Sequence, residues 1–116
     1  MQENAQFTFW ESGDKSLKDE IADLFPEMSA QAFIAKKLKG YSTLRVEQLL
    51  SSKKLDQING THDPALYEVK IKGRMAGARF IAIRISQTGI RLLLIFKGSG
   101  SGGAVERWLP KARSRI

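Results

Sequence analysis

Hydrophobic and polar residues alternate strictly at the start of the C-terminal half of the chain. Tyr67, Val69 and Ile71 are separated by charged residues, which predicts a β-strand with one covered face and one charged face. Residues 80–85 and 90–96 are apolar at both parities, which is typical of strands covered on both sides. The breaks between these three segments contain glycine and are short enough for hairpins. The pattern therefore predicts an antiparallel meander whose first strand lies at an edge of the sheet.

Helical spacing replaces this alternation in the N-terminal half. Apolar stripes within residues 17–28 and 30–38 recur every three or four positions, and they predict an amphipathic helical hairpin that needs a sheet to cover it. Residues 44–50 predict a shorter third helix, and the aromatic segment 7–10 predicts a strand before the helices. A last short helix with basic side chains is expected from about residue 104.

Together these elements predict one α+β domain over residues 1–116, in the order β-α-α-(α)-β-β-β. An antiparallel sheet would be packed by the N-terminal helical hairpin and followed by a short basic helix. The chain contains no cysteine and one histidine, His62, so neither a metal site nor a cofactor is expected. Without a long apolar run or a signal-peptide pattern, a cytoplasmic protein away from the membrane is expected.

Charge is distributed unevenly along the chain, whose formal net charge is +7. Residues 1–30 hold seven acidic residues against two lysines, a net charge of −5. Residues 70–116 hold eleven basic residues against Glu106, a net charge of +10. Such asymmetry favours a nucleic acid, an anionic membrane or an acidic protein as partner. A basic face that only keeps the protein in solution is the alternative interpretation.

Four short motifs carry a family resemblance, and they are Lys54-Leu55, Leu66-Tyr67-Glu68-Val69-Lys70, Arg79 and Leu93-Leu94-Ile95-Phe96-Lys97. In this order they resemble the RelE/ParE toxin superfamily of type II toxin-antitoxin systems, closest to its phage-derived, HigB-like branch. The resemblance implies a RelE-like fold and a ribosome-dependent mRNA endonuclease, or mRNA interferase. Such an enzyme promotes attack of a ribose 2′-OH on the neighbouring phosphate without a metal ion or cofactor.

The resemblance also implies roles for individual residues. Arg79 is the leading candidate for stabilising the scissile phosphate, because a guanidinium can bind two phosphate oxygens at once. Lys70 and Lys97 match basic positions of the family motifs, and they complete the expected catalytic set together with Glu68. A structural pairing of Glu68 with Arg79 or Lys70 is an equally open interpretation. The expected RNA-binding cations are Lys72, Arg74, Arg84, Arg91, Arg107 and Lys111.

Two departures from the family pattern weaken the expectation of cleavage. Residues 98–103 form a glycine-serine run where relatives continue with a second lysine, and this run is expected to be a mobile connector. The histidine before Phe96 and a C-terminal tyrosine or histidine are both absent from their usual places. The alternatives are a ParE-type inhibitor of DNA gyrase and a relative that binds RNA without cutting it. In each toxin interpretation a cognate antitoxin would form a hetero-oligomer with this chain, and an interferase would also bind mRNA and the ribosome.

Overall fold

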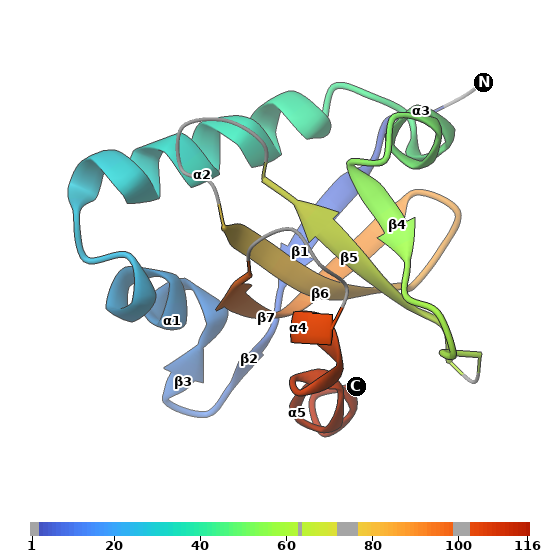
Figure 1. The fold of residues 1–116 in the computed structure, drawn as a ribbon. Helices are drawn as coiled ribbons and strands as arrows, with labels where there is room; N and C mark the ends of the chain where they lie inside the picture. The colour runs from blue at the N-terminus through green and yellow to red at the C-terminus, as the bar shows by residue number, and fades with distance from the viewer. Residues whose placement is uncertain (1–2, 63, 72–76, 99–102) are drawn as a thin grey trace.

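The computed structural model describes residues 3–62, 64–71, 77–98 and 103–116, and its centre is a five-stranded mixed sheet (Figure 1). The strands lie in the order β1, β7, β6, β5, β4, with bounds Gln6–Phe9, Gly89–Lys97, Ala78–Arg84, Leu66–Lys70 and Leu55–Gln57. The α+β class is therefore confirmed. Two expectations are wrong. Strand β1 pairs with β7 in parallel, so the sheet is mixed rather than antiparallel, and β5 is not an edge strand because β4 pairs with its outer side.

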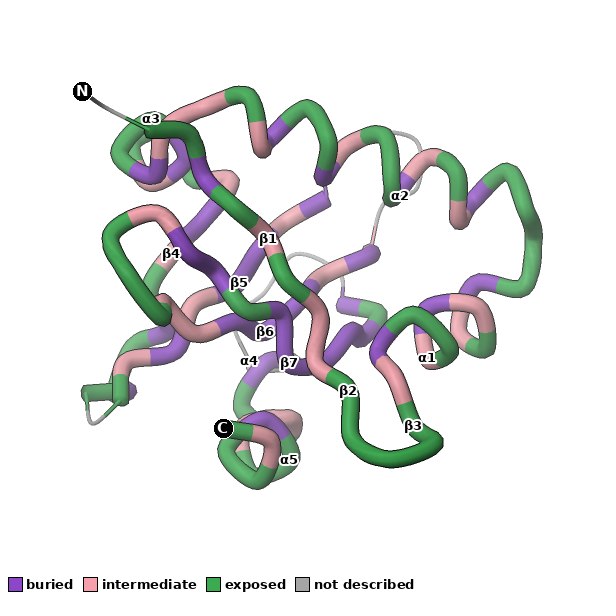
Figure 2. Tube along the Cα trace, turned by 180° about the vertical axis from the view of Figure 1, so that it is seen from behind, coloured by how far each residue is buried: buried purple, intermediate pink, exposed green. Residues whose placement is uncertain are grey.

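Helices cover both faces of the sheet (Figure 1). One face packs against α1, α2 and α3, with bounds Leu17–Leu24, Met28–Tyr41 and Val46–Ser51, and the other against α4 and α5, with bounds Gly103–Glu106 and Leu109–Arg113. A two-stranded ribbon of β2 (Glu11–Ser12) and β3 (Lys15–Ser16) precedes α1. Most residues of β6 and β7 are buried, as predicted for central strands (Figure 2).

The N-terminal helices begin at local signals in the sequence. The Ser16 hydroxyl accepts a hydrogen bond of 3.2 Å from the backbone N–H of Asp19, which caps α1. Pro26 lies in the connection between α1 and α2, because a proline ring cannot continue a helix. The spacing of apolar residues predicts Met28 in the first apolar stripe, but it is 84% exposed, because α1 ends at Leu24 and Met28 begins the next helix on its outer side.

An irregularity in β7 decides which side chains reach each face of the sheet. Leu92 and Leu94 pair with the adjacent β6 residues Ala82 and Ile81, so Leu93 is an extra residue and forms a β-bulge. The paired residues of β1 also end opposite Leu92. Leu93 therefore has no partner residue in either neighbouring strand.

The longest described helix is α2, with 14 residues. In the described part of the chain, no helix combines the length and the apolar character needed to cross a bilayer.

Candidate functional site

Three of the four expected catalytic residues lie together on one face of the sheet. Lys70 of β5 is directly opposite Arg79 of β6, and Glu68 precedes Lys70 by two positions, so alternation places all three side chains on the same side. This is the face that α4 and α5 cover. The three residues line a groove of about 240 Å³, together with β4 and with Val105 and Glu106 of α4.

Arg79 and Glu68 form an ion pair in the floor of this groove. Nη1 of Arg79 donates a hydrogen bond of 2.9 Å to Oε2 of Glu68, and the two side chains are 17% and 11% exposed. The structural pairing considered for Glu68 is therefore present. A guanidinium has five N–H donors, so Arg79 keeps donors for a second oxygen ligand while Glu68 holds its orientation.

Lys70 is fixed mainly through its backbone. Its N–H donates to the carbonyl of Lys54 at 2.9 Å, and its own carbonyl accepts a hydrogen bond of 2.7 Å from the hydroxyl of Tyr41 in α2. The Lys70 ammonium lies 3.7 Å from a carboxylate oxygen of Asp56, whose other oxygen is 4.0 Å from Lys53. These two partly exposed contacts are weak, so the Lys70 ammonium remains able to bind another anion.

The groove is electrically mixed. Its lining includes the cations Lys70 and Arg79 and the acids Asp56, Glu68 and Glu106. The acids outnumber the cations, so a polyanion entering the groove has to compete with carboxylates that are already there. This balance differs from the net basic charge that the sequence predicts for the sheet and the C-terminal part of the chain.

Lys97 does not join the other expected catalytic residues. It is paired with Ala78, so its side chain lies on the face opposite Arg79, where its ammonium is 5.1 Å from the centroid of the Phe25 ring. The residue of β7 opposite Arg79 is Phe96. The structure therefore brings together three of the four expected catalytic residues and separates the fourth.

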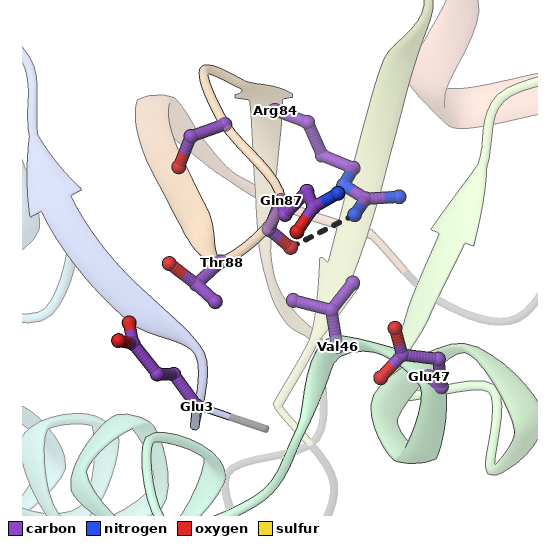
Figure 3. A pocket seen from close by; sticks show the side chains of 7 residues that line it. Glu3, Val46, Glu47, Arg84, Gln87 and Thr88 are labelled. Atoms are coloured by element: carbon purple, nitrogen blue, oxygen red, sulfur yellow. Dashed lines mark hydrogen bonds between the residues drawn. The ribbon is translucent and has the colours of Figure 1, made fainter. Parts of the chain in front are cut away.

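The cations expected to bind RNA are scattered. Arg84 lies in a separate hollow of about 650 Å³ beside α3 and the β6–β7 turn, where it donates to the carbonyl of Gln87 at 2.9 Å and where Glu3 and Glu47 lie nearby (Figure 3). Exposed Arg91 lines another hollow, beside β1 and the C-terminus. Arg107 and Lys111 flank Trp108 in the C-terminal segment. Two further expected residues, Lys72 and Arg74, and the glycine-serine residues 99–102 lie outside the described residues.

Arg115 anchors the C-terminal segment, a role that no local pattern in the sequence indicates. Its guanidinium donates to both carboxylate oxygens of Glu20 at 2.7 and 2.5 Å and to the carbonyl of Leu93 at 2.9 Å. It also lies 3.8 Å from the centroid of the Trp10 ring. The hydrogen bonds from Arg115 hold the pKa of the Glu20 carboxyl below its usual range, although burial acts in the opposite direction.

Among the described residues, no group of three histidine, cysteine, aspartate or glutamate side chains is arranged to hold a metal ion. No protein-family model matches the chain, and no curated protein matches it.

Proposed function

We propose that this chain is a toxin of the RelE/ParE type that cuts mRNA in the ribosome, with the groove between β4, β5, β6 and α4 as its active site. The observation that supports this proposal is the convergence of Lys70, Arg79 and Glu68 in one groove. These are the residue types that metal-independent RNA cleavage requires: an anion-binding arginine, an acid and a base. An antitoxin would act by covering this groove in a hetero-oligomer.

The proposed reaction assigns one role to each of the three side chains. The Glu68 carboxylate accepts the proton of the ribose 2′-OH as the 2′-oxygen forms a bond to phosphorus. The bond from phosphorus to the 5′-oxygen breaks, and Lys70 donates a proton to that oxygen. The products are a 2′,3′-cyclic phosphate and a 5′-hydroxyl. Arg79 keeps its bond to Glu68 and uses its remaining N–H donors to stabilise the charge on the phosphate oxygens.

Primer extension on an mRNA that is being translated in a purified system tests this proposal. Wild-type protein is expected to produce cuts that need the ribosome, and both Lys70→Ala and Arg79→Ala are expected to abolish them. Lys36→Ala is the control, because it removes an exposed cation of α2, on the other side of the sheet from the groove. Loss of cuts in Lys36→Ala as well, or cuts that survive in both groove variants, would overturn the assignment of the site.

The acid-rich lining of the groove favours a second candidate. A groove with three carboxylates and two cations suits the binding of a protein partner better than the binding of RNA. ParE-type toxins bind such a partner, because they act on DNA gyrase without cutting RNA. Inhibition of gyrase supercoiling by the wild-type protein, with no cuts in translated mRNA, would support this function. If neither effect is seen, both toxin proposals fail.

A further inference from the structure

Trp108 forms the outer end of an aromatic stack that begins in the sheet. It lies between α4 and α5 and is half-buried, while Phe96 of β7 is 1% exposed. The two ring centroids are 6.1 Å apart and the ring planes are inclined by 26°. Most members of the apolar cluster around these rings are fully buried. Trp108 therefore keeps part of its surface open to solvent while its ring rests on the buried Phe96.

Two cations lie over this half-buried tryptophan ring. The guanidinium carbon of Arg107 is 5.8 Å and the ammonium of Lys111 is 5.9 Å from the ring centroid. Among the ion pairs of the described residues, none includes Arg107 or Lys111, whereas Lys70 and Arg79 both have acidic partners. Arg107 and Lys111 thus place positive charge beside Trp108 that no close ion pair of the described residues neutralises.

This aromatic and basic surface is continuous with the groove. Phe96 is directly opposite Arg79 in the sheet. Gly98 packs against both residues, because a Cβ built there would lie 2.9 Å from the Phe96 ring and 3.5 Å from Cδ of Arg79. Val105 and Glu106, which precede Trp108, line the groove. The groove at Arg79 and the surface at Trp108 therefore adjoin each other through Phe96 and α4.

The geometry points to a stacking site in which Trp108 receives one unpaired base of a single-stranded RNA while Arg107 and Lys111 bind its flanking phosphates. Aromatic rings take any base by its π-face, and adjacent cations supply the backbone contacts of such sites. The choice of RNA rests on the proposed function. An acidic peptide would satisfy the cations, but its carboxylates would leave the tryptophan face unused.

A fluorescence titration tests the stacking site separately from cleavage. The chain has two tryptophans, so Trp10→Phe leaves Trp108 as the sole tryptophan reporter. The probes are a ten-nucleotide 2′-O-methyl RNA, which cannot be cut by 2′-OH attack, and an abasic chain of the same length. The RNA is expected to quench Trp108 emission, whereas the abasic chain binds by charge without quenching. Equal quenching by both chains, or by polyglutamate, would overturn the inference.

Matched variants then divide stacking from charge, with binding followed by anisotropy of labelled RNA. Trp108→Leu is expected to weaken RNA binding about tenfold and to leave abasic-chain binding unchanged, because it removes one stacked base. Trp108→Phe should recover most of the loss, which guards against a folding defect in the leucine variant. Lys36→Ala, an exposed lysine of α2 on the other side of the sheet, should change neither affinity more than about twofold. An equal loss for both chains in Trp108→Leu would show that Trp108 acts only through packing.

The outcomes separate this inference from the proposed function. Quenching without cuts in translated mRNA would reject the nuclease and keep the stacking site. Cuts that depend on Arg79 but are unaffected by Trp108→Leu, with no quenching, would keep the nuclease and reject the stacking site.

Discussion

Replacing Arg115 by alanine should release the C-terminal segment and destabilise the whole protein. Arg115 lies two residues after α5, outside any helix or strand. Here its side chain is only 9% exposed, and it joins α1, the bulge in β7 and the ring of Trp10. One side chain thus connects the C-terminal segment to three parts of the fold that lie far from it in the sequence.

The size of the effect follows from the groups that lose their partner. Removing the donor deprives the carbonyl of buried Leu93 of a hydrogen bond from a charged group, which costs about 1.5–3 kcal/mol. Loss of the contact with the Trp10 ring adds about 0.5–2 kcal/mol. Glu20, whose side chain is 28% exposed, can regain water and so limits the total. We expect a loss of about 3 kcal/mol, which lowers Tm by about 12 °C for a chain of 116 residues.

Urea denaturation followed by circular dichroism measures this loss, with Arg113→Ala as the matched control. Arg113 belongs to the same helical segment but is exposed, so its removal should cost less than about 0.5 kcal/mol. Arg115→Lys keeps the charge without the planar fork and should fall between the alanine variant and wild type. The reasoning is refuted if Arg115→Ala and Arg113→Ala both stay within about 1 kcal/mol of wild type.

Three further outcomes are expected. Gly98→Ala should destabilise the protein by about 1–3 kcal/mol in urea denaturation, because the added Cβ would meet the buried Phe96 ring. Its control, Gly40→Ala, has open space at an exposed position of α2 and should stabilise the protein by about 0.5–1 kcal/mol. The pKa of Glu20 is lowered in the folded protein, so its contribution to stability is complete above its ordinary pKa of about 4.5 and is lost as pH falls through its pKa in the folded state. The stability difference between wild type and Glu20→Gln should therefore shrink between pH 6 and pH 3. Glu68→Gln should tighten RNA binding, measured by anisotropy, because it removes a negative charge from the groove, and should abolish cuts in primer extension.

Local periodicity explains why most elements could be predicted. Helical stripes and alternating strands depend on neighbouring residues, so α2, α3, β5, β6 and β7 appear close to where the sequence places them. The pairing of β1 with β7 joins residues more than 80 positions apart, and β4 has only three residues beside a polar Ser-Ser-Lys-Lys stretch. Neither strand pairing leaves a local pattern, so the mixed sheet and the covered edge of β5 could not be predicted.

The same distinction applies to the candidate site. Glu68 and Lys70 belong to one strand, so alternation alone places them on one face, and the hairpin carries Arg79 to the same place. Lys97 depends on the register of β7, which a single extra residue reverses. If the pairing between Ala82 and Leu92 continued without a bulge, odd-numbered residues would face odd-numbered residues, and Lys97 would lie on the face of Arg79. No residue type in the sequence marks the bulge.

The bulge at Leu93 therefore has two consequences that support each other. It turns Phe96 rather than Lys97 toward Arg79, which replaces a cation beside the groove by a ring on which Trp108 stacks. It also leaves Leu93 outside the paired register, and Arg115 binds the carbonyl of Leu93 and so holds the segment that carries Trp108 at the bulge. A bulge costs ladder hydrogen bonds, so it persists where other contacts compensate for them. Here the compensation comes from the C-terminal segment, whose basic and aromatic side chains lie beside the groove because that segment is bound at the bulge.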